Sequence, residues 1–388
     1  MHHLLIAVCF LVGSLAAAVG EVSSENNLLP NPFLLNRGGT VGTAADWQVR
    51  RAEIAEVLLA NEYGHVPPSP ENVVSGESLE AGTRFDEKTQ FTARKIKFGP
   101  EHALETTVHL YMPVDAARPL PVILRFGLGG EHAQAANERG YAFVCFEQTM
   151  LDPDTEGHDV VGPAQLAYPD YDWASVAVWA WCSSRVLDYL ETVDEIDVAK
   201  AVITGHSRTG KAALLAGALD ERFALVVPNG SGAGGAASFR NPPKGVETLE
   251  LITQAKRFKS WFQDDFGRFA DRENALPFDQ HFLRALVAPR TVLSTDAYGD
   301  KWCNPQGTQI AWQGAQPVFD FSGVSANNMI HFRDGGHDQL AEDFDVLLDV
   351  ADHVFRKKPL HESLQKAPFP ELTPDFTWTA PGNRATAE

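Results

Sequence analysis

Residues 203–211 read Ile-Thr-Gly-His-Ser-Arg-Thr-Gly-Lys and continue an apolar run that begins at Ala201. A serine between small residues, after a strand and before a helix, is typical of a nucleophile elbow, the turn that presents a serine hydroxyl to a base and an oxyanion site. The generic motif is met only in part. Gly205 stands two places before Ser207, but Thr209 stands two places after it, and the glycine follows one place later. The stretch predicts a strand, a turn and a helix. Whether Ser207 is a nucleophile must be judged from the rest of the chain.

Segments typical of strands alternate with segments typical of helices on both sides of this turn. Such alternation predicts a mostly parallel sheet with right-handed crossovers, and ligands then bind at the carboxyl ends of the strands. We therefore predict an α/β-hydrolase fold, a three-layer sandwich around a mostly parallel central sheet. The expected strands are 104–112, 121–126, 141–146, 201–204, 223–228, 290–295 and 329–332, and the expected helices are 172–190, 208–219, 278–287 and 341–355.

The partners of a serine nucleophile should follow at later strand ends, in the order serine, acid, histidine. His337 has the right position, because it stands in a glycine-rich loop between the last expected strand and the last expected helix. Loop histidines are often merely solvated, but chain order favours this one as the base. His281 on a helix and His331 in a strand fit structural or binding roles better.

The bulk composition is that of one large α/β domain. The chain has 388 residues, of which 44% are hydrophobic, and these supply enough apolar material for such a core. Its formal net charge of −19 argues against binding to nucleic acid or to an anionic membrane, because both partners require a basic surface. Neutral or esterified substrates remain compatible with this charge. We expect a monomer that needs no cofactor and no metal.

The amino terminus resembles a secretory signal peptide. An apolar stretch from Leu4 to Val19 follows Met-His-His, and small residues around Ala18 offer cleavage sites. The absence of Lys and Arg at the start leaves a retained anchor as an alternative. We expect a signal peptide over residues 1–20, a secreted or periplasmic protein, an α/β-hydrolase domain over 30–365, and a loosely held, polar, proline-rich tail over 366–388.

The cysteines do not form a disulfide framework. Removal of the signal peptide leaves Cys145, Cys182 and Cys303, an odd number that allows at most one disulfide. Cys145 lies in an apolar strand and Cys182 in an apolar helix, so ordinary buried packing is the expected role of both. Their spacing does not indicate a zinc site.

Several blocks of the chain match a family pattern over roughly residues 170–355. The first is the elbow itself, which reads Gly-x-Ser-Arg-x-Gly-Lys and includes the displaced glycine. The others are Asp-Glu-Arg-Phe-Ala at 220–224, Gly-Ala-Gly-Gly at 232–235, Leu-Pro-Phe-Asp-x-His at 276–281, Leu-x-Ala-Pro-Arg at 286–290, Asp-x-Trp at 300–302 and Gly-His-Asp at 336–338. With these blocks the chain resembles the glucuronoyl esterases of carbohydrate esterase family 15, and its bacterial members in particular.

The resemblance implies a serine esterase that hydrolyses the ester between a 4-O-methyl-glucuronoyl group of glucuronoxylan and an alcohol of lignin. A pocket for a sugar acid needs donors for the hydroxyls and for the developing oxyanion, and cationic side chains and an indole N–H supply them. The implied residues are Ser207 and His337 for catalysis, Arg208 for the oxyanion, Lys211 and Trp302 for the substrate and, with weaker support, Glu247.

Each of these binding residues also has a structural interpretation. Arg208 and Lys211 could be solvated side chains, although cations at a helix amino end oppose its dipole and therefore call for a reason. Trp302 could be part of the core. Glu247, near the start of an expected helix, could lie away from the pocket.

The chain departs from the common family pattern at the acid of the triad. Many members carry a glutamate where this chain has Gly230. A histidine base needs a carboxylate to fix its tautomer and to stabilise the imidazolium. Other bacterial members place this acid after the next strand, in the loop that here spans 295–302. The resemblance therefore implies Asp300 as the partner of His337, with Asp296 as the second choice.

The sequence is also compatible with two other classes of function. The first is another secreted carbohydrate or acyl esterase, or a related peptidase, that uses the same sheet and triad. The second is a polysaccharide-binding homologue without catalytic activity, which the missing glutamate makes conceivable. Turnover of glucuronate esters distinguishes both from a glucuronoyl esterase.

Overall fold

The computed structural model describes residues 28–382, apart from 156–160, 241, 255–257, 361 and 375. The expected signal peptide lies outside the described residues. Within the described part, none of the helices combines the length and the apolar character that crossing a membrane requires. The remaining cysteines, Cys145, Cys182 and Cys303, are free thiols in buried positions.

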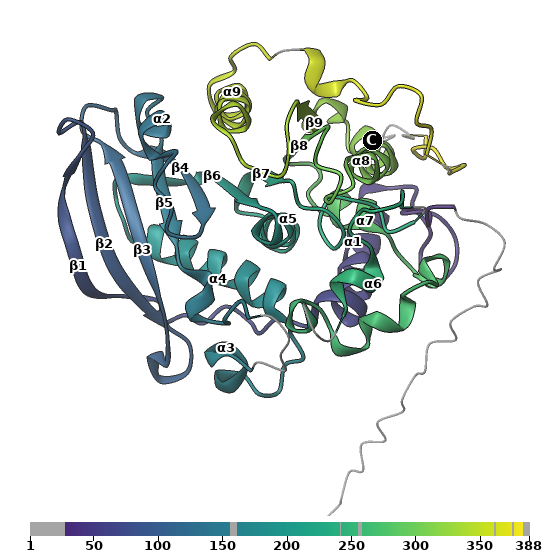
Figure 1. The fold of residues 1–388 in the computed structure, drawn as a ribbon, viewed down its shortest axis with the longest axis horizontal. Coiled ribbons are helices and arrows are strands. Elements are labelled where there is room, and N and C mark those ends of the chain that lie inside the picture. The colour runs from purple at the N-terminus through teal and green to yellow at the C-terminus, as the bar shows by residue number, and fades with distance from the viewer. Residues whose placement is uncertain are drawn as a thin grey trace, which may run out of the picture.

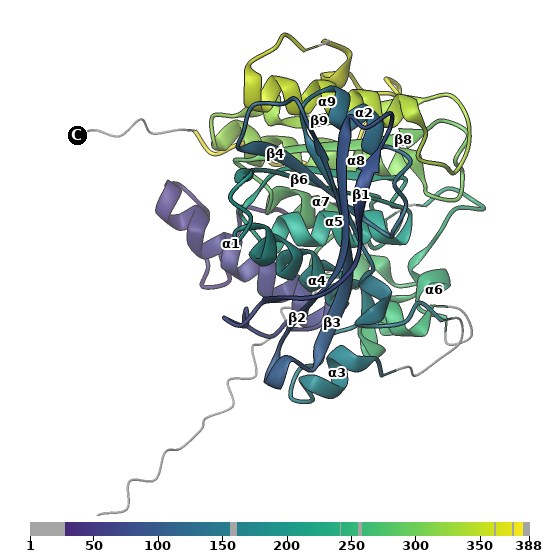
Figure 2. The ribbon, with the colours of Figure 1, turned by 90° about the vertical axis from the view of Figure 1, so that its left-hand side faces the viewer.

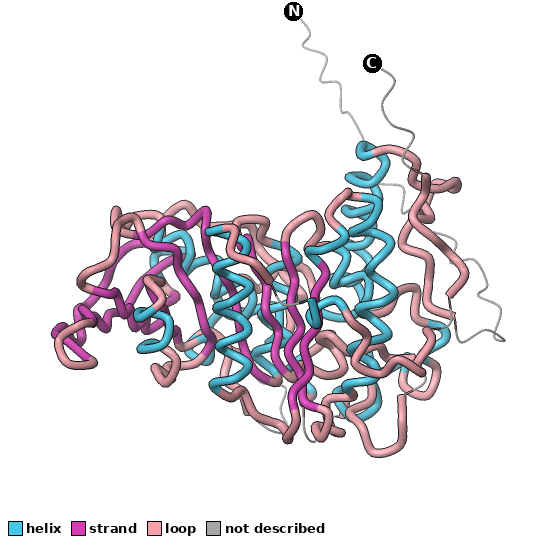
Figure 3. The backbone as a smooth tube through the Cα atoms, turned by 90° about the horizontal axis from the view of Figure 1, so that it is seen from above, coloured by secondary structure: helices cyan, strands magenta, loops and turns pink. Residues whose placement is uncertain are grey.

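One sheet of nine strands, in the order β1-β2-β3-β5-β4-β6-β7-β8-β9, organises the described residues (Figures 1 and 3). Each neighbouring pair from β5 to β9 is parallel. The pairs that join β1, β2, β3 and β5 are antiparallel. The strands are β1 Val74–Arg84, β2 Thr89–Phe98, β3 Leu104–Pro113, β4 Leu120–Phe126, β5 Ala142–Phe146, β6 Ile196–His206, β7 Phe223–Asn229, β8 Thr291–Ala297 and β9 Asn328–Arg333.

Helices cover both faces of the sheet. In Figure 2, α2 and α9 lie on one side of the strands, and α1, α4 and α5 lie on the other. The α-helices are α1 Ala44–Leu58, α2 Ala133–Glu138, α3 Pro163–Ala167, α4 Ser175–Leu190, α5 Arg208–Leu219, α6 Leu249–Ile252, α7 Gln280–Ala285, α8 Pro305–Phe321 and α9 Ala341–Arg356. A π-helical turn, η1 Leu59–Tyr63, extends α1, and 3₁₀ turns span Pro100–His102, Gln148–Met150, Lys259–Trp261, Asp264–Phe269, Glu273–Ala275, Ser325–Asn327 and Glu362–Gln365.

Two large hydrophobic cores result, because alternate side chains of each strand point to opposite faces of the sheet, and a small third cluster surrounds Ile330 and Phe332 of β9. In β4, Val122 and Leu124 belong to the larger core, which includes residues of α1, α4, α5 and α7. The residue between them, Ile123, belongs to the smaller core with residues of α2 and α9. This mixed α/β arrangement with a mostly parallel sheet agrees with the prediction from the alternating segments.

The C-terminal tail differs from the expectation of a loosely held end. The ring of Phe369 packs against Phe332 and Tyr298, at centroid distances of 5.8 and 5.6 Å. The amide of Phe369 donates to Oε1 of Gln309. Further on, Trp378 stacks on His281, with ring centroids 5.7 Å apart. The tail is polar on average, but these aromatic side chains attach it to the domain.

Candidate active site

The turn between β6 and α5 holds Ser207 in a strained backbone conformation. Its φ is 57° and its ψ is −124°, so the serine lies in the left-handed half of φ/ψ space. A Cβ at Gly205 would lie 2.3 Å from the carbonyl oxygen of Thr209, and one at Gly210 would lie 2.8 Å from that of Asn229. A side chain larger than that of glycine would collide with the backbone at both positions. This explains why the second glycine of the motif stands at position 210.

Thr209 occupies the place where the generic motif has glycine, and its side chain supports the turn. Its hydroxyl oxygen accepts a hydrogen bond from the amide of His206 at 3.0 Å and donates to the carbonyl of the same residue at 2.8 Å. The amide of Ser207 donates to the carbonyl of Asn229 at 2.9 Å, which ties the turn to β7. Ser207 is thus held at the carboxyl end of a central strand.

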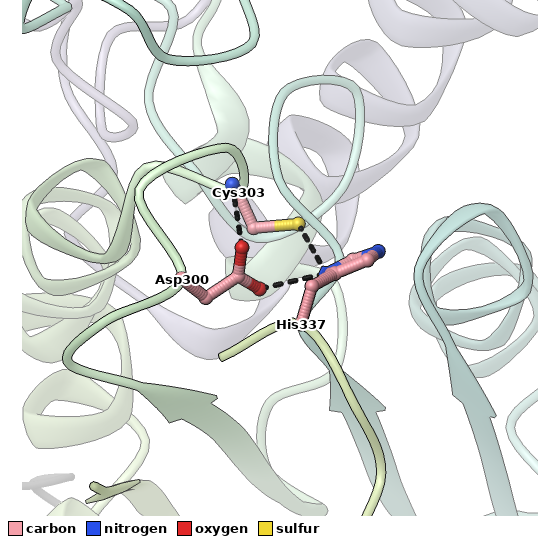
Figure 4. Close-up of side chains that lie close together, drawn as sticks. All are labelled: Asp300, Cys303 and His337. Carbon is pink, nitrogen blue, oxygen red and sulfur yellow. Dashed lines mark hydrogen bonds and ion pairs between the residues drawn. The ribbon is translucent and has the colours of Figure 1, made fainter. Parts of the chain in front are cut away.

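A continuous chain of hydrogen bonds joins Ser207, His337 and Asp300. Nε2 of His337 lies 2.9 Å from Oγ of Ser207, and Nδ1 of His337 lies 2.7 Å from Oδ2 of Asp300. The three residues come from the loops that follow β6, β8 and β9, whose carboxyl ends meet at one edge of the sheet. Figure 4 shows the carboxylate of Asp300 pointing at the imidazole ring. The structure therefore brings together the serine, the histidine and the first-choice acid.

The environment of Asp300 favours its ionised form. Its carboxylate is buried, and burial alone raises its pKa. The hydrogen bond and the charge of His337, with a further contribution from the amide of Cys303, nevertheless hold the pKa of Asp300 below its ordinary value. An ionised carboxylate at Nδ1 keeps the proton of a neutral imidazole on that nitrogen, so Nε2 is the acceptor that faces the serine.

Asp296, the second-choice acid, points elsewhere. It lies within β8, two residues after Ser294, so both side chains lie on the same face of the strand. That face looks toward α7, where Arg284 donates to Oγ of Ser294 at 2.6 Å. Burial and the charge of Asp300 raise the pKa of Asp296 well above its ordinary value. A buried carboxyl on this face does not fit the role of partner to His337.

Gly230, at the family's usual glutamate position, lies directly beside Asp300. A Cβ at Gly230 would lie 3.4 Å from Oδ2 of Asp300 and 3.4 Å from Cε1 of His206. Its φ is +48°. A longer side chain at this position would therefore begin next to the carboxylate that Asp300 supplies. Positions 230 and 300 are therefore neighbours in the site.

His206 is part of the site, although the sequence did not single it out. Its ring centroid lies 4.5 Å from that of His337. Its Nδ1 lies 2.6 Å from Oδ1 of Asn229, whose amide nitrogen donates to Oγ1 of Thr295 at 2.8 Å. Burial lowers the pKa of His206 and favours the neutral ring. The sequence does not predict a role for His206, because the motif allows any residue at this position. Its contact with His337 depends on the path of the loop after β9.

Lys211 and Glu247 form a buried ion pair beneath the elbow. Their side chains are 2% and 3% exposed, and Nζ lies 2.7 Å from Oε2 of Glu247. Nζ also donates to the carbonyls of Ser231 and Ala233, at 2.7 and 2.5 Å. All three ammonium hydrogens therefore have protein acceptors. Contrary to the simple expectation of a free substrate ligand, Lys211 can bind a sugar hydroxyl only if that hydroxyl replaces one of these acceptors.

Arg208, the first residue of α5, is held by two side chains from other loops. Its Nη1 donates to Oδ2 of Asp154 at 2.6 Å, and its guanidinium carbon lies 4.9 Å from the ring centroid of Trp261. Trp261 also donates its indole N–H to Oδ1 of Asp154 at 3.1 Å. The guanidinium group is thus fixed beside the nucleophile by an ion pair and by an aromatic face. Neither Asp154 nor Trp261 could be identified from a local pattern, because both come from segments far from the elbow in the chain.

Trp302 lies in the loop between Asp300 and α8. Its side chain is partly buried and packs against the larger core. Its carbonyl accepts a hydrogen bond from the amide of Glu247 at 2.7 Å. The loop that carries the acid is therefore joined to the segment that carries the buried ion pair, and the binding role of Trp302 stays a prediction.

Comparison with known proteins decides the family. The sequence pattern described as "Glucuronyl esterase, fungi" matches residues 99–323, more than half of the chain. The chain belongs to the glucuronoyl esterases. Ser207 and Asp300 fall inside the matched range of this glucuronoyl esterase, whereas His337 lies beyond it.

Individual glucuronoyl esterases and their relatives extend this similarity over most of the chain. A solved family 15 glucuronoyl esterase from Caldicellulosiruptor kristjansonii is 32% identical, has a TM-score of 0.81, and is matched over 91% of this chain and 97% of its own. A carbohydrate esterase from an unknown prokaryotic organism is 32% identical over 86% of this chain and 91% of its own length. A 4-O-methyl-glucuronoyl methylesterase from Podospora anserina is 30% identical over 79% of this chain and 64% of its own.

Proposed function

We propose that this glucuronoyl esterase is a serine hydrolase of the α/β-hydrolase fold. Its substrate is the ester between a 4-O-methyl-glucuronoyl group of glucuronoxylan and an alcohol of lignin. The observation that carries the proposal is the hydrogen-bonded chain from Ser207 through His337 to Asp300, in a member of the glucuronoyl esterase family. The substrate class comes from the family and from the relatives named for this reaction.

The geometry supports a two-step acyl transfer. Oγ of Ser207 attacks the ester carbonyl carbon as its proton moves to Nε2 of His337. The tetrahedral intermediate then expels the alcohol, which takes that proton from Nε2. In the second step His337 removes a proton from water, the resulting hydroxide attacks the glucuronoyl-serine ester, and Ser207 recovers its proton as the acid leaves. Asp300 keeps the imidazole in the required tautomer and stabilises the imidazolium in both steps.

The amino end of α5 is suited to the oxyanion that forms in each step. The helix dipole places partial positive charge at Ser207, and the guanidinium of Arg208, paired with Asp154, adds charged N–H donors at the same end. Lys211 lies one turn further along α5, and its pairing with Glu247 offsets the cost of burying either charge alone. We assign the oxyanion to Arg208. We propose that Trp302 and the Lys211–Glu247 pair bind the uronate ring. A sugar hydroxyl would then replace one of the three protein acceptors of Nζ of Lys211.

Hydrolysis of methyl or benzyl glucuronate esters tests the proposal. We expect turnover by the parent protein, and a loss of about 10³-fold or more in Ser207→Ala while the fold and binding of the product acid persist. Near-parental activity of Ser207→Ala would exclude the serine mechanism. Stronger turnover of acetylated xylan or of short acyl esters would assign the protein to a different esterase class.

A binding protein without catalytic activity is the second candidate. It would bind glucuronoxylan equally well with and without Ser207→Ala, and the parent would not turn over any of the esters. The complete triad geometry favours the enzyme.

We further propose that residues 1–20 are a removed signal peptide, and that a monomer acts outside the cytoplasm, without a cofactor, on a polysaccharide and not on nucleic acid or membranes. The amino-terminal sequence of the secreted protein and its mass in solution test these statements.

A further inference from the structure

Cys303 lies against the same imidazole nitrogen that Asp300 contacts. Its Sγ is 3.3 Å from Nδ1 of His337, and Nδ1 is 2.7 Å from Oδ2 of Asp300. The sulfur, the nitrogen and a carboxylate oxygen all lie within 4.8 Å of one another (Figure 4). Among the residues that the structure describes, this is the one group of three such side chains close enough to share a metal ion.

The three side chains offer ligands that match a soft or borderline divalent cation. Thiolate, imidazole and carboxylate bind Zn²⁺ at about 2.3, 2.0 and 2.1 Å, which in a tetrahedron places the ligand atoms roughly 3.3–3.7 Å apart. The sulfur–nitrogen distance already lies in that range. Nδ1 of His337 and Oδ2 of Asp300 lie 2.7 Å apart, so they would have to move apart by less than about 1 Å to reach this range. His337 stands after Gly335 and Gly336, and its side chain is 34% exposed, so the ring has room to adjust.

We propose that Asp300, Cys303 and His337 form a binding site for Zn²⁺ or Cd²⁺, and that occupation of this site switches the esterase off. The inhibition rests on the function proposed above, whereas the metal site itself does not. A water molecule or an oxygen of a bound acid would complete the tetrahedron.

The proton balance explains the inhibition. In the free enzyme the neutral imidazole carries its proton on Nδ1, directed at Asp300, and Nε2 accepts from Ser207. A metal on Nδ1 requires that proton to move to Nε2, and the thiol of Cys303 loses its proton to solvent, so one proton is released per ion. Nε2 then carries a hydrogen and cannot accept the proton of Ser207. The nucleophile is left without its base.

The metal-bound cluster is electrically balanced. A divalent cation with one thiolate and one carboxylate forms a neutral cluster, which reduces the cost of burying these groups. Cys303 and Asp300 are 2% and 3% exposed. The net charge of −19 also attracts cations toward the protein.

Cys145 offers a matched control inside the same protein. It is also a free buried thiol, and its Sγ contacts the carbonyl of Gly129 at 2.8 Å, much as Cys303 contacts that of Gly230 at 2.8 Å. Cys145 does not belong to any metal-binding group among the described residues. Replacement of Cys145 should therefore leave the response to metals unchanged.

The first experiment measures inhibition of the parent enzyme by Zn²⁺ and Cd²⁺ in chelator-treated buffer, with Mg²⁺ as a hard-cation control and EDTA for reversal. We expect inhibition by the two soft ions only. Cys303→Ala and Cys303→Ser should raise the inhibitory concentration by about 100-fold or more, because the thiolate is the strongest ligand for these ions. Cys145→Ala should respond like the parent. Equal inhibition of the Cys303 variants and the parent would overturn the proposal.

The second experiment does not depend on turnover. Titration of the Ser207→Ala protein with Cd²⁺ should produce the thiolate-to-metal charge-transfer absorption with a stoichiometry of one. A second substitution, Cys303→Ser or His337→Ala, should abolish or strongly weaken this absorption. Absence of the band in Ser207→Ala, or its persistence without Cys303, would refute the metal site. If the parent does not hydrolyse glucuronate esters, the proposed function is wrong. The titration still tests whether the metal site exists, because it does not depend on turnover.

Discussion

At the scale of single residues, the choice between two aspartates has the clearest consequence for catalysis. Asp300→Asn should lower kcat by up to about 10⁴-fold, because an amide can present the wrong hydrogen-bonding group to Nδ1 of His337. Asp296→Asn should have a much smaller effect, since the carboxylate that contacts His337 is that of Asp300 and burial already favours the neutral form of Asp296. The measurement is kcat on benzyl glucuronate, with the melting temperature of each variant as control. A larger loss in Asp296→Asn would reverse the assignment.

The space beside Gly230 provides a complementary test. Adding Gly230→Glu to the Asp300→Asn variant starts a new carboxylate side chain 3.4 Å from the present acid. We expect partial recovery of kcat, limited by the strain of a glutamate at a φ of +48°. Gly230→Gln in the same background is the matched control and should not recover activity. Equal activity of the Glu and Gln variants would show that this position cannot supply the acid.

Asp154 is a positioning residue for the proposed oxyanion site. It holds the guanidinium of Arg208 and the indole of Trp261 through its two carboxylate oxygens. Asp154→Asn keeps the size of the side chain but removes its charge, so kcat should fall roughly tenfold, in line with the loss of a charge-assisted hydrogen bond, while KM changes little. Trp261→Phe, which removes the N–H donor and shortens the aromatic face but leaves the ion pair between Asp154 and Arg208 in place, should have a smaller effect. A rise in KM at constant kcat would place Asp154 in ground-state binding instead.

At the scale of elements, the π-helical turn η1 places a carboxyl group in the interior. Glu62 is fully buried and accepts a hydrogen bond from Nε2 of Gln280 at 2.6 Å. Burial raises its pKa from 4.5 to about 8. In the range between these two values the folded protein keeps a proton that the unfolded chain has lost. The contribution of Glu62 to the free energy of unfolding should therefore be largest at or below about pH 4.5. It should fall as the pH rises toward 8.

Glu62→Gln tests this linkage, because glutamine has nearly the shape of the neutral acid. Each pKa unit corresponds to about 1.4 kcal/mol, so the loss in the parent can reach several kcal/mol across this window. The variant should show a flatter dependence of the free energy of unfolding on pH between 5 and 8, measured by denaturant titration. Glu250→Gln, at an exposed position in α6, should keep the parental slope. The same slope in Glu62→Gln and the parent would contradict the prediction.

At the scale of the whole molecule, the C-terminal tail stabilises the domain although it lies outside the sheet. Removal of residues 366–388 exposes the surfaces that Phe369 and Trp378 cover, and each of these partly buried aromatic side chains contributes about 1 kcal/mol by burial. We expect the melting temperature to fall by roughly 3 °C. Truncation after Gly382, which retains both aromatics, is the control and should leave the melting temperature unchanged. Equal melting temperatures of the two truncated proteins would show that the tail contributes nothing.

The position of the nucleophile and most of the strands follow from local patterns, whereas helices α1 and α8 were not predicted. Helix α5 was predicted with the bounds that the structure has, and the strands from β3 onward and α9 were predicted to within a few residues, except that β6 begins five residues before its predicted start. These segments bury one face or both, so their side chains repeat with the period of the element. Strand β1 was missed because most of its residues are exposed, which removes the alternation, and its pairing partner β2 was missed with it.

The relations between loops are decided only by the tertiary structure. Sequence reasoning named both Asp300 and Asp296, but the path of the loop after β8 determines which carboxylate meets His337. Similarly, one helical turn along α5 places Lys211 near the nucleophile, yet its partner Glu247 and its carbonyl acceptors come from segments twenty or more residues away. A local pattern specifies which face of an element is buried. It does not specify which distant loop packs against that face, because this contact forms only when the strands assemble and bring their carboxyl ends to one edge.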